Sequence, residues 1–360
     1  MPYEGKIKLE ELPETQKKNI SRIMQDPEFV KLYALIEKAT NMHQCRFNYK
    51  YEEGPAMSLP GLAKMRTTAR LVAARTYMLS EKKEYGKALQ SVGTGLRFGN
   101  FLSDEPLIIS QLVRIAIDDI SVKSLNLFIN RKEVILSDKD YSKLISLVER
   151  KNRAITKAFE GEIVFHIFES RTNLAAFFDS ISPSHGNKGL NIFSNLYGSY
   201  LGHPILKADH AFYIRTISLL ENYSRKPYFL VRDKYREWDR KIYQDRFHAL
   251  KHIISSMTLP ALDRVLQIQA NNDARLDSFK LALALKIYRE KHGSYPDSLA
   301  PLVPGIIPDI PLDPFTGKDY IYRREGKGLI VYSIGPNEKD DNGINNPEQK
   351  QDDIAFKVTN

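Results

Sequence analysis

The sequence predicts a mainly α protein with a small C-terminal α+β module. Three observations support this fold class. Apolar residues recur at helical spacing through most of the first 258 residues, a long segment almost free of Gly and Pro follows, and two strand-like runs come after it. We therefore expect a body of stacked helical hairpins over residues 1–258. Residues 259–360 should form a long helix packed on a short antiparallel sheet.

The helical body is interrupted by loops rich in Gly, Pro, Ser or Asn at residues 51–61 and 180–203. Its long helix, its Lys83-Glu84-Tyr85 turn and the Ala88-Leu89 that follows resemble one tetratricopeptide-type hairpin. Outside the loops, apolar spacing predicts helices at residues 29–36, 62–74, 83–98, 107–128, 138–179, 211–223 and 232–243.

The C-terminal module is predicted from its helix stop and its turns. The segment from Leu259 to Lys291 forms one helix, or two with a bend near Asn271-Asn272. It ends at His292-Gly293, because Gly commonly takes the left-handed conformation after a helix. Strand-like runs at residues 320–322 and 329–333 flank a Gly-containing stretch, which predicts a hairpin.

The composition limits the classes of partner and chemistry. The 360 residues carry a net charge of +9, but the basic residues form no block. No zinc knuckle, RNP-type motif or helix-turn-helix is recognisable, so nucleic acid is not an expected partner. The single cysteine, Cys45, excludes an internal disulfide and a thiolate-rich metal site.

The apolar segments are too short to predict a membrane span, which needs about 18 or more uninterrupted apolar residues. The start at Met1-Pro2-Tyr3 also lacks the apolar core of a signal peptide. We expect a cytoplasmic protein if Met1 is the native start, and a periplasmic or cell-surface protein if an anchor or signal has been removed. Membrane contact would then come only through an anchor absent from this chain.

The C-terminal tail concentrates oxygen ligands after the second predicted strand. Calcium prefers about six to eight oxygens from carboxylates, amides and main-chain carbonyls, often within one loop. Gly335 and Gly343 would let such a loop turn its carbonyls inward. Composition alone leaves a Ca2+ loop and a solvated acidic tail as two open interpretations. The candidate ligands are Asn337, Asp340, Asp341, Asn342, Asn345, Asn346, Asp352 and Asp353.

Three motifs between Leu281 and Phe356 resemble the globular domain of the type II secretion major pseudopilin. They are a Tyr-x-x-x-x-Gly-x-Tyr-Pro turn after a long helix, an Asp-Pro-aromatic segment closed by Gly, and a Tyr-Ser-x-Gly strand end with an Asp-Ile ending. The residues that match are Tyr288, Gly293, Tyr295, Pro296, Asp313, Pro314, Phe315, Gly317, Tyr332, Ser333, Gly335, Asp353 and Ile354.

This resemblance implies that the loop after the second predicted strand binds calcium. Asn337 stands where the family has Asp, the main-chain carbonyl of Ile334 is adjacent, and Asp352 and Asp353 match the closing acids. The sequence departs from the family in two ways, since Asn337 is neutral and Glu338-Lys339 lengthens the loop where Gly is usual.

Residues 60–360 resemble uncharacterised bacterial envelope proteins that join a tetratricopeptide-like half, usually behind a membrane anchor, to this pseudopilin-like end. The resemblance implies a non-enzymatic scaffold or interaction protein of the periplasm or cell surface. Its helical hairpins would present a groove to a protein partner. The apolar assembly helix of pseudopilins is missing, so a pilus-like fibre is not expected. The matching segments are residues 71–75, 111–116, 161–162 and 281–293.

An enzyme remains the alternative function. Glu162, His166 and Glu169 are spaced at i, i+4 and i+7, so they share one face of a predicted helix. Such a face could perform acid-base chemistry or hold a metal, with the loop at residues 180–189 closing over it. Neither a Gly-x-Ser-x-Gly nucleophile nor a phosphate-binding Gly-rich loop appears in the sequence.

Overall fold

The computed structural model describes most of the chain in separate stretches. It begins with an α1–α2 pair, α1 (Glu14–Gln25) and α2 (Pro27–Thr40), in which Asp26 caps α2 by accepting a hydrogen bond from the Glu28 N–H. The described residues are 13–42, 45–51, 57–130, 134, 137–148, 153–172, 203–244, 252, 255, 259, 262 and 264–359.

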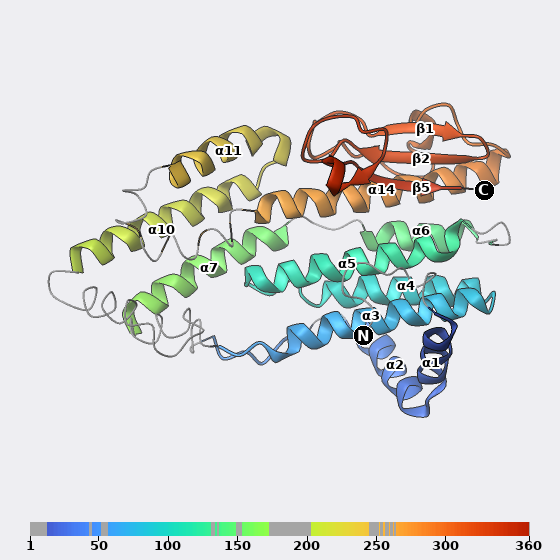
Figure 1. Cartoon of the computed structure of the whole chain (residues 1–360), viewed down its shortest axis with the longest axis horizontal. Coiled ribbons are helices and arrows are strands. Elements are labelled where there is room, and N and C mark those ends of the chain that lie inside the picture. The colour runs from blue at the N-terminus through green and yellow to red at the C-terminus, as the bar shows by residue number, and fades with distance from the viewer. Residues whose placement is uncertain are drawn as a thin grey trace.

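Three helices form the centre of the helical body: α3 (Pro60–Glu81), α4 (Tyr85–Asn100) and α5 (Ile108–Ile129). Each packs against the other two, and α1 and α2 lie against α3 and α4 (Figure 1). Small residues allow the close packing, since a Cβ on Gly95 of α4 would lie 2.5 Å from the Ser121 Oγ of α5. Helices α3 and α4, which pack together, form the predicted hairpin at residues 62–98.

Helices α6 (Asp138–Val148), α7 (Arg153–Thr172), α10 (His203–Ser224) and α11 (Tyr228–Gln244) complete the body. Helix α7 packs on α10, and α6 lies against the long helix α14 (Val265–His292). Helix α10 begins at His203, earlier than the predicted helix at residues 211–223. The predicted loop at residues 180–203 lies outside the described residues except for His203, which begins α10.

Helix α14 joins the body to the C-terminal sheet. Between Leu276 and Ile287 every residue except Asp277 is buried, because α5 and α6 cover one side and the sheet covers the other (Figure 1). One hydrophobic cluster accordingly runs from Leu96 of α4 through α14 to Val358. The helix is continuous through Asn271-Asn272 and ends as predicted, with Gly293 at φ 80° and its N–H bonded to the Arg289 carbonyl.

The sheet has the antiparallel order β1-β2-β5, with β1 (Ile321–Glu325), β2 (Gly328–Ser333) and β5 (Ile354–Val358). β2 is central and wholly buried, whereas β5 alternates buried and exposed residues. The predicted hairpin joins β1 to β2 through Gly326. A second small sheet pairs β3 (Asn345–Asn346) with β4 (Gln351–Asp352) inside the acidic tail.

The predicted fold class, mainly α with a small C-terminal α+β module, is confirmed. Sheet and body share one core along α14, so the helix that the sequence assigned to the module also packs against α5 and α6. Among the described helices, none combines the length and the apolar character that crossing a bilayer requires.

Candidate functional site

Residues 335–353, which we call the closing loop, leave β2 and return to β5 through a tight crossing. Gly335 has a φ of 66°, and a Cβ built on it would lie 2.2 Å from the Asp352 carbonyl oxygen. Glycine is required here on both counts, because a side chain would strain the backbone and collide with the returning chain. The crossing holds the beginning and the end of the loop side by side.

Asp353 lies at the centre of the closing loop and has no exposed surface. Its Oδ2 accepts hydrogen bonds from the N–H groups of Asp341 (3.0 Å) and Gly343 (2.7 Å). Its Oδ1 is buried and has no hydrogen-bond partner in the described part of the chain. Burial first, and then the negative charges of Asp341 and Asp340, raise the pKa of Asp353 to about 6. Such an oxygen is costly unless a proton or a cation satisfies it.

Two further carboxylates and one amide surround this buried acid. The Asn337 Nδ2 donates to the Asp341 Oδ2 (2.8 Å) and to the Lys350 carbonyl (3.0 Å). The Asn337 N–H donates to the Asp352 Oδ1 (3.3 Å), and the Asp352 N–H donates to the Asp341 Oδ2 (3.3 Å). Burial and the Asp341 charge raise the pKa of Asp352. The structure thus brings Asn337, Asp341, Asp352 and Asp353 together.

The chemistry of these donors fits a hard cation. Every available ligand is a carboxylate, amide or main-chain oxygen, as calcium prefers, and the buried Asp353 Oδ1 is an acceptor in need of a partner. Within the described residues, no three His, Cys, Asp or Glu side chains already converge as a metal site. One reason lies in Asn337, whose amide nitrogen bridges Asp341 and Lys350. A cation bound there would have to displace that amide.

The two other predicted ligands have different surroundings. Asp340 accepts hydrogen bonds at Oδ1 from the Tyr332 hydroxyl (2.9 Å) and the Asn342 N–H (2.8 Å), which direct it toward the sheet. Ile334 lies at the entrance of the closing loop, where its backbone N–H bonds to the Asp313 carboxylate. Neither residue takes part in the hydrogen bonds that join Asn337, Asp341, Asp352 and Asp353.

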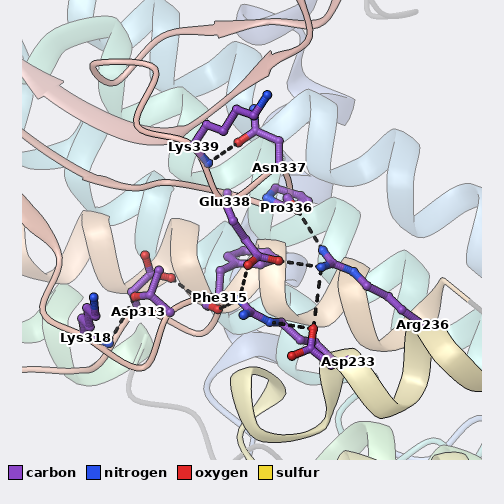
Figure 2. A network of polar contacts seen from close by, with 12 residues as sticks. Asp233, Arg236, Asp313, Phe315, Lys318, Pro336, Asn337, Glu338 and Lys339 are labelled. Carbon is purple, nitrogen blue, oxygen red and sulfur yellow. Dashed lines mark hydrogen bonds and ion pairs between the residues drawn. The ribbon is translucent and has the colours of Figure 1, made fainter.

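Glu338 ties the closing loop to α11, a contact that the sequence did not predict. Its Oε1 accepts from Arg236 (2.6 Å), and its Oε2 pairs with Arg232 (2.7 Å). Arg236 also donates to the Pro336 carbonyl (3.0 Å), so it binds the loop at two points (Figure 2). Glu338 has a φ of 60°, the left-handed region where glycine is the usual residue. We call Arg232, Arg236 and Glu338 the arginine clamp.

The Asp313-Pro314-Phe315 segment contacts both the arginine clamp and the end of β2. The Asp313 Oδ1 accepts from the Phe315 N–H (2.8 Å) and from the Ser333 hydroxyl (2.9 Å), which links this segment to the end of β2. Arg232 in turn donates to the Phe315 carbonyl. The matched motif residues Asp313 and Ser333 therefore meet in space, and α11 contacts the segment at Phe315.

The alternative enzyme site contains one described side chain. The Glu162 Oε1 accepts a hydrogen bond from the Ile108 N–H (3.2 Å), so it caps the first turn of α5, and burial raises its pKa. A Cβ on the neighbouring Gly161 would lie 1.9 Å from the Pro106 carbonyl oxygen. The glycine therefore allows α7 to lie close to the segment before α5. The side chains of His166 and Glu169 lie outside the described residues.

Comparison with known proteins adds no relative from which a function could be transferred. No protein-family model, curated protein or solved structure matches this chain. The function therefore has to be inferred from the closing loop and its contacts.

Proposed function

We propose that this chain is a non-enzymatic scaffold of the bacterial cell envelope whose closing loop binds a calcium ion. The observation that carries the proposal is the buried carboxylate of Asp353, whose Oδ1 has no donor among the described residues, while Asp341 lies beside that carboxylate and is hydrogen-bonded to Asp352. Three carboxylates held together by a fixed crossing repel one another, and a divalent cation would reverse that repulsion.

Each ligand would have a distinct role in this site. Asp353 would supply the buried oxygen, Asp341 and Asp352 the flanking carboxylates, and Asn337 and Lys350 a side-chain or main-chain carbonyl oxygen. The bound ion would offset most of the charge of its three carboxylate ligands and hold Glu338 in place for α11. Calcium thereby becomes a staple between the end of the sheet and the helical body.

The helical body supplies the scaffold part of the proposal. Helix α2 and the residues next to it expose large apolar side chains that the fold does not cover, which is typical of protein-interaction surfaces. These residues support a protein partner for the stacked hairpins, and no catalytic role is assigned to Glu162 because it caps α5. The exposed side chains are Ile23, Val30, Leu32, Leu35 and Met42.

The proposed location follows from the calcium loop. Loops with dissociation constants of about 0.1–1 mM are occupied outside the cytosol. The closing loop offers a neutral Asn337 in place of a carboxylate and needs an amide displaced, and both features favour weak binding. We therefore propose the periplasm or the cell surface as the location of the protein.

Calcium titration by calorimetry of the wild type and Asp353→Asn tests the proposal. Asn can still accept from Asp341 and Gly343 while its amide nitrogen takes the unsatisfied side, so the variant should fold. We expect calcium binding in the wild type and none in Asp353→Asn. Asp297→Asn, an exposed carboxylate of the same module paired with Arg324, serves as the matched control and should bind normally. Equal binding by Asp353→Asn would overturn the assignment.

A further inference from the structure

A cavity of about 690 Å³ lies where α7, α10, α11 and α14 meet the chain segment before β1. It is partly open to solvent, and its volume suits a small organic ligand, since such pockets commonly measure about 300–1,000 Å³. The closing loop does not line it, and neither does Glu162. The cavity is therefore separate from the proposed calcium site.

Three carboxylates line this cavity. Asp273 and Asp277 stand one helical turn apart on α14, and Asp309 comes from the segment before β1. Asp273 accepts a hydrogen bond at Oδ1 from the Gln269 Nε2 (2.7 Å), and the Asp277 Oδ2 accepts from the Tyr320 hydroxyl (3.0 Å). These bonds fix the two acids on the cavity wall.

The charges around the two acids do not compensate for their burial. Burial, followed by the charge of Asp277, raises the pKa of Asp273 to about 7 although Arg114 acts against the shift. Burial and the charge of Asp309 raise the pKa of Asp277 to about 6 despite Lys280. The Arg114 guanidinium is engaged with the amide oxygens of Gln111 and Gln269.

Two cations stand at the cavity rim, Arg225 and Lys226, and the first is engaged elsewhere. Arg225 pairs with Glu221 (2.5 Å) and Glu160 (2.7 Å). The cavity therefore combines an acidic wall with two arginines, Arg114 and Arg225, that are bound to other partners, an arrangement that favours a ligand carrying its own positive charge.

Most of the remaining lining is apolar or aromatic. Tyr223, Tyr228 and Phe229 line the α10–α11 side, and Leu266 and Ile310 lie across from them. Aromatic faces attract organic cations, and apolar walls bind the carbon skeleton that carries the charge. We propose that this cavity binds a small organic cation, a primary amine on an aromatic or aliphatic skeleton, with its ammonium group between Asp273 and Asp277.

An ammonium group bound there stabilises the ionised carboxylates, so binding near pH 6.5 releases protons. Release fades above pH 8, where both acids are already ionised in the free protein. Charged and titratable groups on every packed element act on this equilibrium. They are Asp273, Asp277 and Lys280 of α14, Arg114 and Asp118 of α5, Tyr223 of α10, Arg225 and Lys226 before α11, Tyr228 of α11, and Asp309, Asp313 and Tyr320 before or beside β1.

Calorimetric titration with tryptamine tests the proposal, with tryptophol as its neutral analogue, in phosphate and in MES buffer at pH 6.5. We expect tryptamine to bind with a buffer-dependent heat and tryptophol to bind at least about tenfold more weakly. Asp273→Asn and Asp277→Asn should each weaken tryptamine by about tenfold or more, because each removes one charged acceptor. Asn resembles a protonated Asp in shape, so both variants should fold. Asp297→Asn is the exposed control.

Three results would overturn the proposal. Tryptophol could bind as tightly as tryptamine, which would make the cavity an apolar site only. Tryptamine could bind the two Asn variants as tightly as the wild type, or fail to bind the folded wild type at millimolar concentration. Addition of magnesium or calcium separates a metal site from an amine site, since a metal in the cavity would displace tryptamine and an amine site would be indifferent.

Discussion

The arginine clamp makes the module's attachment to the helical body testable. Glu338 receives charged hydrogen bonds from two arginines one turn apart on α11, at 2.6 Å and 2.7 Å. Replacement of Glu338 by Gln keeps the shape of the side chain and removes its charge. The variant should therefore weaken both contacts without opening a cavity.

The expected loss in the free energy of unfolding follows from the exposure of each charged side chain. The Arg232 and Glu338 side chains are 20% and 27% exposed, so their pair lies at the upper end of surface ion pairs, which contribute about 0.2–1 kcal/mol. Arg236 is 41% exposed and is screened by solvent, so its pair contributes less. We expect Glu338→Gln to lower the free energy of unfolding by about 1 kcal/mol.

Urea unfolding in a double-mutant cycle isolates this energy. The cycle combines Glu338→Gln with Arg232→Gln, and the exposed Glu348→Gln is the matched control. We expect a coupling energy clearly above the additivity error of about 0.3–0.5 kcal/mol, and a smaller value at 1 M salt. Additive single and double variants would refute the clamp.

Two further predictions concern other parts of the fold. Gly161→Ala should destabilise the protein by about 3 kcal/mol, because its Cβ would meet the Pro106 carbonyl, whereas Gly86→Ala, with no atom within 4 Å, should be neutral or stabilising; thermal unfolding distinguishes them. In EDTA, stability should fall as pH rises from about 4 to 7, since folded Asp273 and Asp277 keep protons there that the unfolded chain has released. Urea midpoints measure this slope, and the Asp273→Asn/Asp277→Asn double variant should flatten it.

Local signals explain what the sequence predicted well. Gly293 ends α14 through its own left-handed backbone, and Gly326 closes the hairpin between neighbouring strands. Both features depend on residues a few positions apart. Of the predicted ligands in the oxygen-rich tail, Asn337, Asp341, Asp352 and Asp353 lie together, whereas Asp340 and Ile334 have other partners.

Long-range contacts explain what the sequence did not reveal. Arg236 and Glu338 are about a hundred residues apart in the sequence, and neither segment contains a pattern that predicts their contact. The i, i+4 spacing of Arg232 and Arg236 was the available signal. Glu162 fits the pattern of an acid-base face, yet its partner is the backbone at the start of α5. The pKa values of Asp273 and Asp277 are raised first by burial under the elements that enclose them, which the sequence does not show.

The most direct test of the central proposal is thermal unfolding of the wild type in excess EDTA, in millimolar calcium and in millimolar magnesium. A calcium concentration a hundredfold above the dissociation constant stabilises the folded state by about 2.7 kcal/mol. We predict a higher Tm in calcium than in EDTA and a smaller shift in magnesium. The same Tm in calcium and in EDTA would contradict the calcium-bound closing loop.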